Sequence, residues 1–258
     1  MLSDSSIARF PATHHVLLHH LESVIKQLRT LNSDPAPFPA TQNPVEFFNS
    51  AIDFGISVYA AKLLQLFESI EHSIENETYL IYAQSGRAIL ENVATLRYYS
   101  KHVDIVTASE AWKNKSLTDL LLRKANDTID RFVRGNRFAW DAFIEGRFDE
   151  LTKTPHQDHL AQVNSTTCLQ KWFKESPKVE PLYDLFCDLV HPNLGSNLLT
   201  MGVRDNNLVA GAVGAQSTSM FIIAPTLAGV LGAFKTVKSG VQAMAALRLY
   251  PDALPKIH

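Results

Sequence analysis

The stretch YLIYAQSGRAILENVATLRYYSKH, residues 79–102, decides the fold because it reads as one long helix with two different sides. At about 3.6 residues per turn, its branched apolar side chains share one side: Ile89, Leu90, Val93 and Leu96. The opposite arc carries polar and aromatic side chains: Gln84, Arg87, Glu91, Thr95, Tyr98 and His102. A helix of this kind is stable when its apolar side is buried against other helices. The stretch therefore predicts a helix inside a bundle.

Helical spacing of apolar residues continues on both sides of this stretch. It predicts further helices over residues 13–31, 43–73, 118–143 and 156–173, and another that ends at His191. Ser116 or Thr118 would cap the third of these. Three prolines within residues 34–39 break the pattern, and Asn43-Pro44 is typical of a helix start. The predicted fold class is mainly α, a multi-helix bundle.

The pattern changes after His191. Residues 198–203 and 208–213 flank a polar turn at 204–207, which predicts one small β-hairpin. A long apolar helix is expected over 217–247, with a kink at Pro225. We expect one helical domain over residues 1–258. Its parts are an N-terminal helix and Pro-rich connector at 1–40, a bundle core at 43–191, the hairpin at 198–213 and the long helix at 217–247.

Composition limits the classes of function. With 24 Lys and Arg against 26 Asp and Glu, the formal net charge of -2 does not support a broad surface for RNA or nucleotides. Two cysteines are too few for a disulfide scaffold, and residues 1–10 lack the apolar run of a secretory signal, so we expect a cytoplasmic protein. Residues 206–234 hold no charge, but polar residues and Pro225 interrupt them, so we predict a buried helix and no membrane span.

Two helices carry the polar residues that could form a site. Arg87 and Glu91 lie one turn apart, and the helix that ends at His191 carries Asp184 and Asp188 on the same side. If both polar sides met inside the bundle, these five residues would be candidate catalytic residues. Arg87 would stabilise phosphate charge, and His191 would act as an acid or base. The candidate substrate-binding residues are Tyr98 and Asn193. The alternatives are a solvated helix side for Arg87 and Glu91 and a helix-capping role for His191.

A metal site is a further alternative. Asp188 and His191 have half of the ligand spacing of a carboxylate-bundle metal site, and Glu91 could join them. A complete site needs a second Glu-x2-His pair, and the order Glu68-x2-Glu71-His72 does not provide it. Motifs for phosphate loops and hydrolases are also lacking. We therefore expect no metal and no cofactor.

The order of these segments resembles a loose group of uncharacterised bacterial all-helical proteins. In that group one helix carries Arg-x3-Glu, here Arg87 and Glu91, and a later helix carries a Tyr, an apolar run and a His, here residues 183–193. The group is distantly similar to HEPN domains, many of which are ribonucleases of toxin and antiviral systems. HEPN nucleases place an Arg four to six residues before the His, whereas the helix of His191 contains no Arg. The resemblance therefore implies that Arg87 would have to supply the cation.

These observations lead to one preferred function and two alternatives. We expect a non-catalytic interaction or regulatory protein of a bacterial stress or defence system, with a protein partner. The alternatives are a HEPN-like RNA-cleaving or nucleotide-processing enzyme that uses Arg87 and His191, and a metal-binding bundle. The apolar residues of 221–247 surround that helix, and small residues such as Gly229, Gly232 and Gly240 allow close approach. We therefore expect a second copy of the chain to cover part of it, giving a homodimer.

Overall fold

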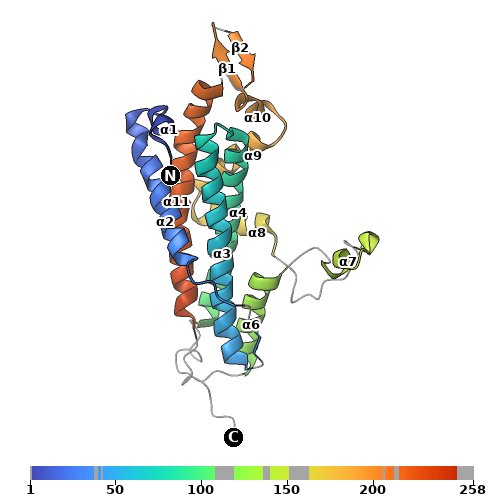
Figure 1. Cartoon of the computed structure of the whole chain (residues 1–258). Helices are drawn as coiled ribbons and strands as arrows, with labels where there is room; N and C mark the ends of the chain where they lie inside the picture. Colours follow the sequence, from blue (N-terminus) through green and yellow to red (C-terminus); the bar gives the residue numbers. More distant parts are fainter. Residues whose placement is uncertain are drawn as a thin grey trace.

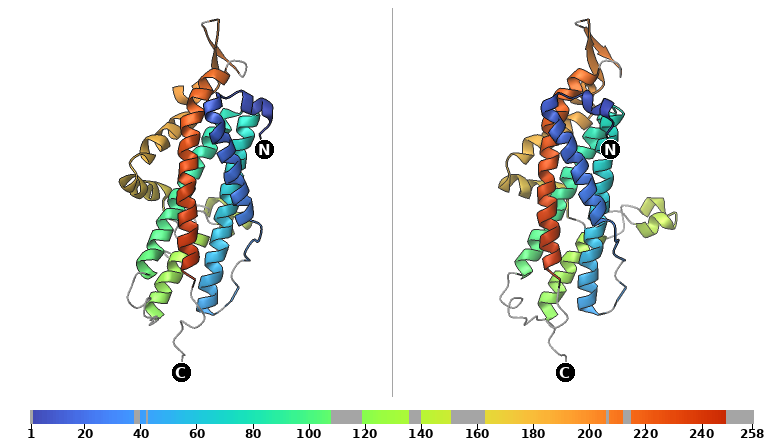
Figure 2. Two further views of the ribbon diagram at one scale, coloured as in Figure 1. Left: turned by 90° about the vertical axis from the view of Figure 1, so that its left-hand side faces the viewer. Right: turned by 60° about the vertical axis from the view of Figure 1, so that its left-hand side comes forward.

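Four long helices lie alongside one another in this computed structural model, which describes residues 2–37, 40–41, 43–107, 119–135, 140–150, 163–205, 207–211 and 215–248. They are α2 (His15–Leu31), α3 (Pro44–Glu75), α4 (Tyr79–Thr107) and α11 (Ala215–Ala246), as Figures 1 and 2 show. Helices α6 (Asp119–Arg134), α8 (Ser165–Glu175) and α9 (Val179–Val190) pack on them. The predicted mainly α bundle is confirmed.

Helix α4 is covered on both of its sides. It contacts α3 and α11 as well as α6, α8 and α9. The apolar residues that the sequence places on one side are buried: Ile89, Leu90, Val93 and Leu96. Thr95, from the polar arc, is also buried, and its hydroxyl donates to the Glu91 carbonyl oxygen at 2.9 Å. The polar arc of α4 therefore contacts α9 at Glu91 and α8 at Tyr98, whereas Gln84 near its start is exposed.

Helix α11 is packed largely by its own chain, which changes the role of the small residues in it. A methyl group on Gly229 would overlap Leu182 of α9, and one on Gly240 would lie 3.2 Å from Leu96 of α4. Leu231 is only 1% exposed within the single chain. Gly229 and Gly240 therefore accommodate side chains of the same chain, whereas the position of Gly232 has open space around it.

The hairpin is present but shorter than expected. Strands β1 (Met201–Arg204) and β2 (Asn207–Ala210) pair antiparallel, with Met201 opposite Ala210, and lie at one end of the bundle in Figure 1. The prediction that the first strand starts at Leu198 is wrong, because residues 194–198 form the short helix α10 (Leu194–Leu198). The side chain of Asn193 caps α10 by accepting from the Ser196 backbone N–H.

Other helix bounds differ from the predicted ones. Helix α6 ends at Arg134 instead of continuing to residue 143, and α7 (Trp140–Ile144) is a separate short helix. The predicted caps Ser116 and Thr118, and residues 156–162, lie outside the described residues. The helix expected over 156–173 begins only at Ser165, because the Asn164 side chain accepts from the Thr166 N–H at 3.0 Å and caps it there.

The N-terminal residues form short elements that the sequence pattern does not predict: α1 (Asp4–Ala8) and the 3-10 helix η1 (Ala12–His14). A second 3-10 helix, η2 (Phe148–Glu150), packs on α7, and both stand to the side of the bundle in Figure 1. Pro225 lies inside α11, which continues through it as one helix. Among the helices that the structure describes, none is both long and apolar enough to cross a membrane.

The start of the chain is attached to the end of α3 by hydrogen bonds to one carboxylate. The Ser3 hydroxyl donates to Glu75 Oε1 at 2.6 Å, and the Ser3 backbone N–H donates to Glu75 Oε2 at 3.0 Å. Arg9 Nη2 donates to the Ile74 carbonyl oxygen at 2.7 Å, at the C-terminal end of the same helix. The hydrogen bonds from the Ser3 side chain and backbone lower the pKa of Glu75 to about 2.

This arrangement predicts a loss of stability in acid. A carboxyl whose pKa is lowered in the folded state stabilises the fold above its ordinary value of 4.5 and loses that contribution as the pH falls toward about 2. Glu75→Gln should therefore reduce the acid sensitivity of the free energy of unfolding, measured by denaturant titration across this pH range. The exposed Glu180→Gln is the matched control. Equal pH dependence in Glu75→Gln and the unmodified chain would contradict the prediction.

Candidate functional site

Arg87 and Glu91 form a half-buried cluster with a tyrosine of α9. Arg87 Nε donates to Glu91 Oε1 at 3.0 Å, and the Tyr183 hydroxyl donates to the same oxygen at 2.9 Å. The Arg87 guanidinium lies over the Tyr183 ring, 5.8 Å from its centroid. The cluster joins α4 to α9. Sequence reasoning did not include Tyr183 as a site candidate, although it is the Tyr of the motif at residues 183–193 and directly precedes Asp184.

The ionisation of this cluster is set by its partial burial and by its hydrogen bonds. Burial, followed by the hydrogen bond to Glu91, raises the pKa of Tyr183 above its ordinary range, so the phenol stays a neutral donor. Burial opposes the charge of Arg87, but the hydrogen bond to Glu91 and neighbouring groups leave its pKa raised. The Glu91 carboxylate thus already neutralises the guanidinium charge of Arg87, and the Tyr183 hydroxyl donates a second hydrogen bond to the same carboxylate oxygen, Oε1.

The polar residues of α9 face the other way. The side chains of Asp184, Asp188 and His191 are exposed. His191 is the C-cap of α9, and its backbone N–H donates to the Cys187 carbonyl oxygen at 3.0 Å. It ends the helix at the position that the following proline predicts. These three residues therefore do not point with Arg87 and Glu91 into one interior site.

Asp188, in the last turn of α9, and Asn193, the N-cap of α10, join the two helices. The Asn193 side-chain amide donates to Asp188 Oδ1 at 2.6 Å, while its oxygen caps α10. A methyl group on Gly195 would overlap the Asp188 carboxylate, so α10 approaches this side chain closely. The structure brings together Asp188 and Asn193, as it brings together Arg87 and Glu91. No contact among the described residues joins the two pairs.

The direction of α9 separates the candidates further. Tyr183 lies beside Arg87 and Glu91, whereas Phe186 packs on Tyr82 and against Gly86, so α9 runs antiparallel to α4. His191 is eight residues beyond Tyr183, a rise of roughly 12 Å along the helix axis. It therefore lies toward the N-terminal end of α4. Tyr98 lies in the opposite direction, roughly 16 Å along α4 from Arg87.

Tyr98 takes part in the contact between α4 and α8. Its ring stacks on His102 with centroids 4.1 Å apart, and Lys171 Nζ of α8 lies 4.6 Å from its centroid. Glu175 of α8 forms ion pairs with Arg97 and Lys101 in the same region. Tyr98 therefore lies at the contact between α4 and α8, whereas Asn193 follows the C-terminal end of α9. The two predicted substrate-binding residues do not line one common space.

The structure offers no ligand set for the metal alternative in the part of the chain that it describes, since no three His, Cys, Asp or Glu side chains there could hold an ion. Of the two thiols, Cys168 is buried and Cys187 is half-buried beside the Arg87 cluster. Cavities of about 290, 250 and 360 Å³ are lined by residues other than the seven candidates. No match was found when the chain was compared with protein-family models, curated proteins and solved structures.

Proposed function

We propose that this chain is a non-catalytic interaction or regulatory protein that binds a protein partner through the outer side of α9 and α10. The observation that carries the proposal is that the candidate residues fall into two groups, one packed between helices and one exposed. Arg87 and Glu91, with Tyr183, are engaged in holding α9 on α4, while Asp184 and His191 are exposed on the outer side of α9. A setting in a bacterial stress or defence system rests on the resemblance of the two helices to HEPN-like proteins.

The outer α9 surface combines acidic and apolar side chains. Glu180, Asp184 and Asp188 are exposed along it, and Leu185 between them is 37% exposed. Leu194 is 69% exposed and directly precedes Gly195, whose backbone touches Asp188. Exposed leucines with a charged rim are typical of a protein-binding surface. Its chemical complement is a segment that presents Lys or Arg around an apolar side chain.

Site-specific cross-linking in the native cell would test this surface. A photoreactive residue at position 184 should give a discrete protein adduct, whereas one at His20, which is exposed on α2, should not. Charge reversal by Glu180→Lys together with Leu185→Ala should abolish the adduct, because both the acidic and the apolar contacts are removed. An adduct that forms equally from both positions, or that survives the two substitutions, would count against the surface.

An RNA-cleaving enzyme is the alternative that the same variants can exclude. It would need Arg87 and His191 to act on one phosphate, although roughly 12 Å of helix separates His191 from the Tyr183 beside Arg87. We expect no RNA turnover that depends on His191. Cleavage of unstructured RNA by the purified chain would be followed on gels, with His191→Ala and the exposed His20→Ala as a matched pair. Turnover that is lost only in His191→Ala would overturn the non-catalytic proposal.

We further propose that the chain acts in the cytoplasm as a homodimer, through the side of α11 at Gly232. This glycine is exposed with open space around it, unlike Gly229 and Gly240. Light scattering at micromolar concentration should give the mass of two chains, and Gly232→Gln should give one chain without lowering the free energy of unfolding. A measured mass of one chain for the unmodified protein would contradict the homodimer proposal.

A further inference from the structure

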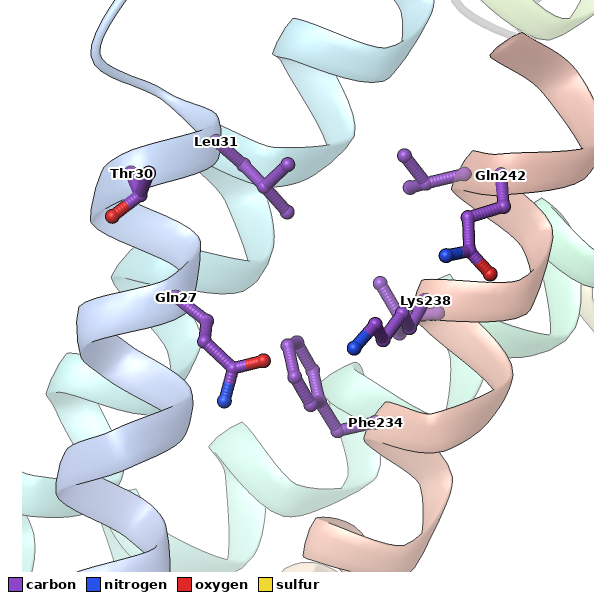
Figure 3. A pocket seen from close by; sticks show the side chains of 8 residues that line it. Gln27, Thr30, Leu31, Phe234, Lys238 and Gln242 are labelled. Carbon is purple, nitrogen blue, oxygen red and sulfur yellow. The ribbon is translucent and has the colours of Figure 1, made fainter. Parts of the chain in front are cut away.

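A cavity of about 290 Å³ lies between α2 and α11, and none of its lining residues belongs to α9 or α10 (Figure 3). Its apolar wall includes Leu31 of α2 and Phe234, Val237 and Val241 of α11. Gln27 and Lys238 extend from the two helices toward the space over the Phe234 ring (Figure 3). The cavity thus combines an apolar wall with the polar residues Gln27, Thr30, Lys238 and Gln242, of which Gln27 and Lys238 extend toward the Phe234 ring.

Packing beneath the cavity keeps its wall in place. Phe234 and Val237 are 6% and 1% exposed, so their positions are fixed by the core. The Phe234 ring meets Phe67 of α3 edge to face, with centroids 6.0 Å apart. Helix α2 ends at Leu31, whereas α11 continues to Ala246. The end of α2 therefore leaves Leu31 42% exposed at the edge of an apolar wall.

The residues that line the cavity carry a single charge, which is positive. Lys238 is the one ionisable side chain among the lining residues, and it is exposed at the mouth. None of the ion pairs among the described residues includes it. An ammonium over an apolar wall favours a ligand with one anionic group and an apolar body. The amide of Gln27 can donate a second hydrogen bond to the same anionic group.

We propose that this cavity binds a medium-chain aliphatic monocarboxylate, with the carboxylate at Lys238 and Gln27 and the alkyl chain against Leu31, Phe234 and Val241. The volume supports an alkyl chain of this length. A buried apolar cavity of about 150 Å³ binds benzene, so about twice that volume accommodates an apolar body of roughly ten carbons. This inference stands on residues separate from those of the proposed partner surface, and either can fail without the other.

Calorimetric titration of the full chain with hexanoate, octanoate and decanoate, below their micelle-forming concentrations, would test the proposal. Affinity should rise by about fourfold for each added methylene, because each one buries apolar area on the same wall. Decyltrimethylammonium, which has the same alkyl chain with a cationic head, should bind at least about tenfold more weakly than decanoate. No saturable binding of decanoate, or equal binding of the two decyl compounds, would overturn the assignment.

Two variants locate the carboxylate and the alkyl chain. Lys238→Gln should weaken decanoate by about tenfold or more and leave decan-1-ol unchanged, since only the charged hydrogen bond is lost. Lys235→Gln, an exposed lysine of α11 outside the lining, is the matched control and should change neither ligand. Val241→Phe should weaken both ligands by filling the cavity. Unchanged decanoate affinity in Lys238→Gln would overturn the site, as would NMR shifts at Lys238 that follow protein concentration rather than decanoate, because they would indicate a second chain as the occupant.

Discussion

Phe186→Ala is expected to lower the free energy of unfolding by about 3–5 kcal/mol, as measured by denaturant titration. The Phe186 side chain is fully buried and lies against Tyr82, with ring centroids 6.3 Å apart. It also fills the space left by the missing side chain of Gly86 on α4. Its truncation would open a void where the Phe186 ring lies against the backbone of α4 at Gly86. The cost combines lost burial with the cavity that remains.

Phe173→Ala is the size-matched control, because Phe173 on α8 is only half-buried and should cost less. Gly86→Val should also destabilise, since its added carbons would overlap the Phe186 ring. The double variant Gly86→Val with Phe186→Ala should be more stable than the sum of the single effects predicts, because the added side chain enters the void. Strict additivity of the two effects would show that Gly86 and Phe186 are not packed against each other.

Tyr82→Phe should lower the free energy of unfolding by about 1–2 kcal/mol. The Tyr82 hydroxyl is fully buried between α4 and α11. It donates to the Ile223 carbonyl oxygen at 3.2 Å and lies 2.8 Å from the Thr226 hydroxyl oxygen. Pro225, beside Thr226, lacks a backbone N–H and removes one hydrogen bond from this turn of α11. The phenol therefore stabilises a turn of α11 that has lost one of its own backbone hydrogen bonds at Pro225.

The matched control is Tyr98→Phe, because Tyr98 is half-buried at the α8 contact and its hydroxyl forms no hydrogen bond with the described residues. It should change the free energy of unfolding by less than Tyr82→Phe does. A cycle with Thr226→Val would measure the coupling between the two hydroxyls. A coupling energy near zero, with Tyr82→Phe as stable as the unmodified chain, would contradict a role for this hydrogen bond.

Much of the helical framework could be predicted because its signals are local. Apolar spacing around Ile89 and Leu96 predicted their burial, and Pro192 predicted that α9 ends before it. Helix α10 was missed because its residues, LGSNL, include Gly, Ser and Asn, which are weak helix formers. The Asn193 and Ser196 pair that caps it is nonetheless a local signal that could have indicated its start.

The site was less predictable because it depends on how α9 is rotated against α4. A helical wheel shows that Asp184, Asp188 and His191 share a side, but it does not show which side meets a neighbour. The rotation is decided by contacts between distant residues, above all Phe186 against Gly86. These contacts direct Tyr183 toward Glu91 and leave Asp184 exposed. The sequence therefore grouped Asp184, Asp188 and His191 correctly on one side of α9, but it did not show that this side faces away from α4.

Helix α9 is held by two insertions, Phe186 at Gly86 of α4 and Leu182 at Gly229 of α11. If α9 moved by one turn along its axis, a side chain would overlap a helix backbone at both places. Helix α9 can therefore separate from the bundle only by moving away from α4 and α11 together. In native-state hydrogen exchange, the backbone amides of α9 should then share one opening free energy, instead of fraying progressively from its ends. The outer α9 surface would accordingly be rigid, and a partner bound to it would be mechanically coupled to both α4 and α11.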